Sequence, residues 1–250
     1  MNMVFLTALG VGGATIAGAV IGFFFQDVSR KVNDMILSFA AGIMLAAAVI
    51  GLILPSVDIV GKRGIWITVA GIFAGAVFLN LMDRLTPHLH RLSGTDREEH
   101  AHNKNLNRAL LFMMAVAIHN LPEGMAAGVG FGSEDTKAAI TVAVGIALQN
   151  IPEGIVTVSP LIMAGVSRKR AFMMAVITGI IEVVGTLLGY LSASVSRQIL
   201  PFALAFAGGT MLYIISDEMI PETHSNGYER IATYSLLTGF IVMLIMDVLI

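Results

Sequence analysis

The sequence predicts an all-α polytopic membrane protein in which eight transmembrane helices form an inverted repeat. Of its 250 residues, 56% are hydrophobic and 13% are charged, whereas about a quarter of the residues in a typical soluble domain are charged. Apolar stretches of roughly 20 residues, the length that crosses a bilayer, follow one another along the chain. Short phrases also recur in stretches that are expected to cross the membrane in opposite directions.

Eight apolar stretches are expected to span the membrane. They cover residues 3–25, 35–56, 64–82, 108–131, 137–163, 170–191, 200–220 and 229–250. The first stretch has no Lys or Arg before Arg30. It therefore lacks the basic start of a cleaved signal peptide and is interpreted as a span. The connections are short apart from 83–107, so residues 1–250 are expected to form a single transmembrane domain.

The distribution of basic residues predicts the orientation. With the N-terminus outside, the inner connections carry 11 of the 15 Lys and Arg residues and the outer ones carry 4. Because inner loops are enriched in Lys and Arg, both termini are expected to lie outside. This orientation makes 83–107 a cytosolic loop between spans three and four, and the loop contains His100 and His102.

Two pairs of related phrases indicate internal symmetry. Residues 119–124 read HNLPEG and residues 149–154 read QNIPEG, in the fourth and fifth spans. Residues 39–45 in span two resemble residues 206–212 in span seven, and a proline follows each. Both pairs join spans of opposite direction, which is typical of inverted-topology repeats with a site at the repeat interface. We therefore expect a 3+2+3 arrangement of spans.

The repeated phrases place polar side chains and a proline at membrane depth. Ionisable residues there are costly and usually functional, and a proline leaves a backbone carbonyl without its helical donor. A helix turns about 100° per residue, so three polar side chains of each phrase share one face. These are His119, Asn120 and Glu123 in the first phrase, and Gln149, Asn150 and Glu153 in the second. If the two phrases face each other, six polar groups converge.

These groups predict a metal site. Imidazole, carboxylate and amide oxygen suit Zn²⁺ and neighbouring divalent metals, whereas Cu(I) prefers sulfur ligands. Glu182, in the middle of span six, is a natural additional ligand, and Met44 could supply a thioether. Three alternatives stay open: a buried polar network without metal, a protonated Glu182 in a packing interface, and Met44 as ordinary core filling.

These residues resemble the ZIP family of divalent-metal transporters, in particular its bacterial GufA-like and zinc-uptake members. The resemblance covers essentially the whole chain, and the paired HNxPEG-type phrases are its specific part. It implies a transporter domain with a binuclear metal site at the membrane midplane and an elevator-like movement. One metal position would use His119, Glu123, Gln149 and Glu153, with Met44 nearby. The other would use Asn120, Glu123, Asn150, Glu153 and Glu182.

The resemblance also implies the substrate, the partners and the cofactor requirement of the chain. Zinc is the expected substrate, with iron, cadmium, manganese and cobalt as further candidates, and uptake across the plasma membrane is the expected direction. Lipid and a second copy of the chain are the expected partners, and neither a catalytic cofactor nor nucleic acid is expected. Asn150 replaces the Asp of some members. Because an amide adds no negative charge, the second ion is expected to bind weakly.

Further polar residues lie at the inner ends of spans three and seven. They are Asp83, His88, His90, Asp217 and Glu218. The resemblance suggests that they form an exit site, although membrane interfaces collect polar residues in any case. The histidines of the loop either bind metal or belong to a solvated linker.

Two other functions are weighed against transport. An intramembrane metal-dependent hydrolase would need a general base and an open coordination position, and the sequence has no His-Glu-x-x-His motif. A passive metal channel remains an alternative, but an inverted repeat favours alternating access. The sequence therefore predicts a transporter and not an enzyme.

Overall fold

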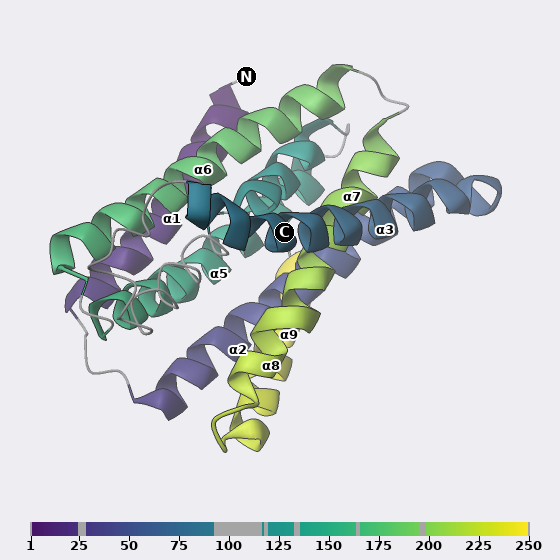
Figure 1. The fold of residues 1–250 in the computed structure, drawn as a ribbon. Helices are drawn as coiled ribbons and strands as arrows, with labels where there is room; N and C mark the ends of the chain where they lie inside the picture. The colour runs from purple at the N-terminus through teal and green to yellow at the C-terminus, as the bar shows by residue number, and fades with distance from the viewer. Residues whose placement is uncertain are drawn as a thin grey trace.

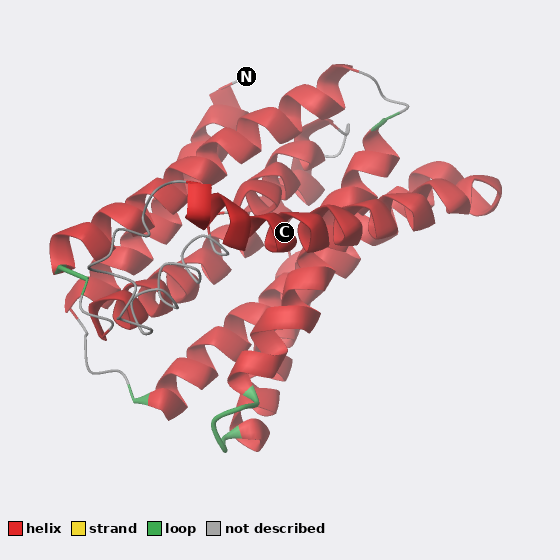
Figure 2. Ribbon diagram, in the orientation of Figure 1, coloured by secondary structure: helices red, strands yellow, loops and turns green. Residues whose placement is uncertain are grey.

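The fold is that of a computed structural model, which describes residues 2–24, 29–92, 117, 120–132, 136–163, 166–195 and 199–249. The described residues form helices and turns and contain no strand (Figure 2). Within them, six helices are long and apolar enough to cross a membrane. The all-α prediction is confirmed, and these helices agree with a chain that crosses the membrane several times.

The helices follow one another along the whole described chain (Figure 1). In order, they are α1 (Asn2–Phe24), α2 (Arg30–Ala46), η1 (Ala47–Ile53), α3 (Leu54–Leu92), η2 (Gly130–Gly132), α5 (Thr136–Met163), α6 (Arg168–Val195), α7 (Leu200–Ile214), η3 (Ile215–Met219), α8 (Ile220–Thr223) and α9 (Glu229–Leu249). Residues 120–129, before η2, are also helical. Helix α3 continues to Leu92 and so includes the first residues of the segment expected to be a loop.

The helical stretch Arg30–Met82 contains two of the expected spans. It has 53 residues, which as one straight helix would be about 80 Å long, against about 30 Å for the hydrocarbon core of a bilayer. Gly61 interrupts it, with φ 61° and ψ −172°, a conformation that a residue with a Cβ rarely adopts. The chain therefore turns at Gly61 and separates 35–56 from 64–82.

Two π-helical segments, η1 and η3, occupy matching places in spans two and seven. Pro55 and Pro221 each follow the last π-helical residue by two positions. A proline has no N–H and crowds the carbonyl four residues earlier, so the helix widens locally. The residue before each proline instead donates to a carbonyl five residues back: Leu54 to Val49, and Ile220 to Ile215.

Close helix crossings occur in matching pairs, and each crossing joins a helix from the first half of the chain to one from the second half. A Cβ on Gly18 of α1 would overlap the carbonyl oxygen of Ile151 on α5, so the two backbones touch. A Cβ on Gly185 of α6 would overlap the carbonyl oxygen of Leu121 in the same way. Gly185 follows Gly18 by 167 residues, and Ile151 follows Leu121 by 30 residues. Gly18 therefore corresponds to Gly185 and Ile151 to Leu121, so the two crossings occupy equivalent positions in the repeat.

A second pair of crossings repeats this relation. Gly42 on α2 lies against the carbonyl of Leu236 on α9, and Gly209 on α7, 167 residues after Gly42, lies against the carbonyl of Ile72 on α3. Small residues permit such close approach between membrane helices. We divide the described helices into two groups according to their contacts (Figure 1). We call them the first group (α1, 120–129, α5 and α6) and the second group (α2, α3, α7 and α9).

The two groups meet along a mainly apolar surface. Helix α2 and η1 of the second group pack against α5 of the first. The buried side chains there belong to one hydrophobic cluster that includes Ile43, Met44, Val142 and Ile146. The contact between the groups therefore depends on apolar packing.

Candidate metal site

The repeated phrases lie inside the first group, on the 120–129 helix and on α5. Helix α5 continues through Pro152 without a break. Its polar side chains face inward, since Gln149 and Asn150 are buried while the neighbouring Leu148 is 38% exposed. The helical arrangement expected from the sequence therefore holds on α5.

Five of the predicted metal ligands are almost fully buried. Each is at most 1% exposed: Asn120, Glu123, Gln149, Asn150 and Glu182. Glu153 is half-buried. Burying polar side chains to this extent costs free energy unless hydrogen bonds or bound ions compensate for the lost water.

Five oxygen atoms of this set have no hydrogen-bond partner in the described part of the chain. Glu123 contributes both carboxylate oxygens, and Asn120, Gln149 and Asn150 contribute their amide oxygens. All five are acceptors, and each is a hard oxygen ligand of the kind that divalent metals bind. The described residues therefore gather buried acceptors for which they supply no donors.

Glu182 on α6 differs from the others because its carboxylate is fully engaged. The hydroxyl of Thr15, on α1, donates to both carboxylate oxygens at 2.7 Å. The amide nitrogen of Asn150 donates to Oε2 at 2.7 Å, and that of Asn120 donates to Oε1. Asn150 also donates to the carbonyl of Val11 at 3.3 Å. Three side chains from three helices thus converge on one carboxylate.

Negative charge is concentrated at this place. Glu123 lies close enough to Glu153 and Glu182 for their charges to act on it. No lysine or arginine is among the buried residues of the described segments. We therefore expect bound cations or protons to balance these carboxyl groups.

The structure locates the remaining predicted ligands only in part. Met44 is 2% exposed on α2, across the apolar contact from α5. His119 lies outside the described residues. Among the residues that the structure describes, no group of three or more His, Cys, Asp or Glu side chains is arranged to hold a metal ion.

The predicted exit residues are spread over two elements. Asp217 is exposed and Glu218 is half-buried on η3. The backbone of α3 runs helically through Asp83, His88 and His90, whose side chains lie outside the described part. The loop histidines at 100 and 102 also lie outside it.

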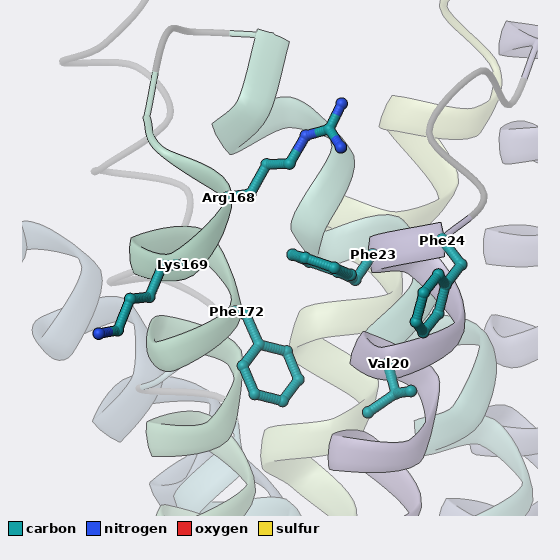
Figure 3. A pocket seen from close by; sticks show the side chains of 6 residues that line it. All are labelled: Val20, Phe23, Phe24, Arg168, Lys169 and Phe172. Carbon is teal, nitrogen blue, oxygen red and sulfur yellow. The ribbon is translucent and has the colours of Figure 1, made fainter.

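A separate pocket opens between the end of α1 and the start of α6 (Figure 3). Phe23 and Phe172 meet there edge to face, with ring centroids 6.1 Å apart. The lining is aromatic, aliphatic and basic: Val20, Phe23, Phe24, Arg168, Lys169 and Phe172. Since no acidic side chain lines this pocket, it is chemically distinct from the candidate metal site.

Thr15 is the residue that sequence reasoning missed. It stands in an apolar span and carries no charge, so nothing in its own surroundings marks it as part of a site. The available signal was the repeat, since Thr15 and Glu182 are 167 residues apart, the spacing that relates Gly18 to Gly185.

The family model for the ZIP Zinc transporter matches residues 82–247 of this chain. The chain belongs to the ZIP family. It is 39% identical to the zinc transporter GufA of Myxococcus xanthus, over 97% of this chain and 96% of that protein. It is 35% identical to the zinc transporter ZIPB of Bordetella bronchiseptica, over 94% of this chain and 77% of that protein. The zinc transporter ZupT of Clostridium perfringens is 31% identical, over 96% and 93%.

Membership confirms the resemblance inferred from the paired phrases. ZIP proteins are transporters and not enzymes, so the metallohydrolase alternative is set aside. The match includes both phrases and Glu182, whereas Thr15 and Met44 precede the matched segment.

Proposed function

We propose that this ZIP protein carries zinc and related divalent metals into the cytoplasm through a site between the 120–129 helix and α5. Family membership establishes divalent-metal transport as its class of activity. The observation that supports the location is the set of five buried oxygens without donors. A buried acceptor left unsatisfied costs about 1–3 kcal/mol, and a bound cation would satisfy several at once.

The proposed ligands come from both phrases. His119, Glu123, Gln149 and Glu153 supply nitrogen and oxygen donors that suit zinc, and Met44 lies across the group contact. Asn120 and Asn150 add amide oxygens beside them. Glu182 borders the second metal position and accepts hydrogen bonds from both asparagines. The metal is the cargo, so no catalytic cofactor is needed.

We further propose eight spans in an inverted 3+2+3 repeat with both termini outside. The turn at Gly61 supports two spans within Arg30–Met82, and the helical residues 120–129 support a span that contains the first phrase. The paired glycine crossings and the paired π segments support the repeat. The plasma membrane and a homodimer are proposed from the family resemblance.

The mechanism that fits this arrangement is an elevator. The first group, which contains the phrases and Glu182, would move against the second group across their apolar contact. Apolar side chains form no specific bonds that would have to break during sliding. On the inner side, Asp83, His88, His90, Asp217 and Glu218 would receive the released ion, and the first three of these residues belong to the cytosolic segment 83–107.

Zinc flux into proteoliposomes tests the proposal. The wild type should show saturable uptake, and the double variant Glu123→Ala/Glu153→Ala should show none, because two carboxylates of the site are gone. Glu229→Ala is the matched control, since it removes an exposed carboxylate at the start of α9. Equal flux in the wild type and the double variant would overturn the proposed site. Flux that never saturates would favour a channel.

A further inference from the structure

The hydrogen bonds around Glu182 have a consistent direction. Thr15 and two asparagines donate to it, and it accepts with both oxygens. Each asparagine thereby turns its amide nitrogen toward Glu182. The amide oxygens are left buried and without partners, together with the two oxygens of Glu123.

We propose that Thr15 and Glu182 are a positioning pair, which holds Asn120 and Asn150 so that their amide oxygens face the transported ion. This inference rests on the proposed function, because the ion is the divalent metal of that proposal. Hydrogen-bonded groups behind metal ligands commonly orient them in this way. Thr15 would then act on the ion only through Glu182 and the two amides.

The engaged state of Glu182 supports positioning over direct ligation. An ion on this carboxylate would have to displace a hydroxyl at 2.7 Å and an amide nitrogen at 2.7 Å. Amide nitrogens donate and do not accept, so they cannot share an ion with the carboxylate. In this arrangement three donors occupy the space around Glu182 that a second ion would need.

The backbone explains how two residues so far apart in sequence meet. Gly154 lies against the carbonyl of Thr15, and Gly124 lies against the carbonyl of Glu182. These glycines directly follow Glu153 and Glu123 in the repeated phrases. The close crossings therefore set the depth of the positioning pair relative to the ion ligands.

Two substitutions of Thr15 test whether its hydroxyl donor positions the ion ligands. Thr15→Val keeps the shape of the side chain and removes the donor, whereas Thr15→Ser keeps the donor. Zinc flux in proteoliposomes and zinc binding to the purified protein in detergent are both measured. Thr15→Val should raise KM and Kd by about tenfold, the lower end for lost support behind a metal ligand, with maximal flux within about twofold. Thr15→Ser should restore wild-type values.

Glu182→Gln separates positioning from ligation. If the pair acts together, the effects of Thr15→Val and Glu182→Gln on KM and Kd should be strongly non-additive. The double variant should then have KM and Kd values no higher than those of the more severe single variant. Wild-type KM and Kd in Thr15→Val would overturn the inference. Fully additive effects of the two substitutions on KM and Kd would also overturn it, because they would indicate that Glu182 binds the ion independently of Thr15. If Thr15→Val does not fold, Thr15→Ala takes its place in the same comparison.

The Glu123→Ala/Glu153→Ala variant is measured in the same vesicles. Loss of flux there, with wild-type behaviour in Thr15→Val, would reject the positioning pair and leave the proposed function standing. Full flux in the double variant would reject the proposed site itself.

Discussion

Glu123 shows at the scale of one residue why this site needs a cation. Both of its oxygens are buried without donors, and two further carboxyl groups act on it. Membrane-depth carboxyl groups without basic partners are satisfied by metal or by protons, and these two compete for the same oxygens. We therefore expect zinc binding at the proposed site to release protons.

Zinc uptake should fall as the pH is lowered. Protons occupy the carboxylate oxygens at acid pH, and metal binds only the deprotonated form. The expected effect is a higher KM at acid than at neutral pH, largely overcome by saturating zinc. Initial rates of zinc flux in proteoliposomes, measured over a series of zinc concentrations at each pH, check this. A KM that does not change with pH would contradict proton competition.

At the scale of elements, the glycines at helix crossings position the site more strictly than apolar packing alone. At the crossings of Gly18, Gly42, Gly185 and Gly209, a carbonyl oxygen occupies the place of the missing Cβ, so even one methyl group forces two helices apart. Crossings within each group are of this kind, while the contact between groups includes larger apolar side chains. Each group is therefore expected to behave as a rigid unit.

Gly42→Ala should destabilise the second group. The new methyl group would collide with the carbonyl of Leu236 and separate α2 from α9. Overpacking of this kind costs about 1–3 kcal/mol, which should appear as a lower midpoint of thermal unfolding in detergent. Gly10→Ala is the matched control, because nothing lies within 4 Å of a Cβ at that position. An equal decrease in the unfolding midpoint of both variants would mean that the close crossing at Gly42 is not the cause.

At the scale of the whole molecule, transport is proposed to depend on movement between the two groups. Gly51 on η1 belongs to the second group and faces Val142 on α5 of the first. A Cβ at position 51 would lie 3.5 Å from the Cβ of Val142, within the range of disulfide-bonded pairs. The chain has no cysteine of its own, so a single disulfide can be introduced across the contact.

Oxidation of the Gly51→Cys/Val142→Cys variant should stop zinc flux, and reduction should restore it. The disulfide would prevent the two groups from sliding, without touching the proposed ligands. Flux before and after oxidation, with the disulfide verified by mass spectrometry, checks this. Each single cysteine variant should be insensitive to oxidation. Full flux in the oxidised double variant would show that this contact does not move during transport.

Hydropathy and short motifs were enough to predict the class of fold, the family and most of the candidate ligands. Hydropathy over about 20 residues is a local property that predicts spans, and the phrases at 119–124 and 149–154 carry their polar side chains in a local helical pattern. The turn at Gly61 and the π segments before Pro55 and Pro221 also depend on nearby residues.

Which polar atoms already have hydrogen-bond partners depends on how distant parts of the chain pack together. Glu182, expected from the sequence as an additional metal ligand, accepts from Thr15, Asn120 and Asn150, while Glu123 accepts from no described group. The physical reason is distance along the chain: Thr15 and Glu182 are separated by 167 residues. A hydrogen bond between them exists only because close glycine crossings bring α1, α5, α6 and the 120–129 helix together at one depth.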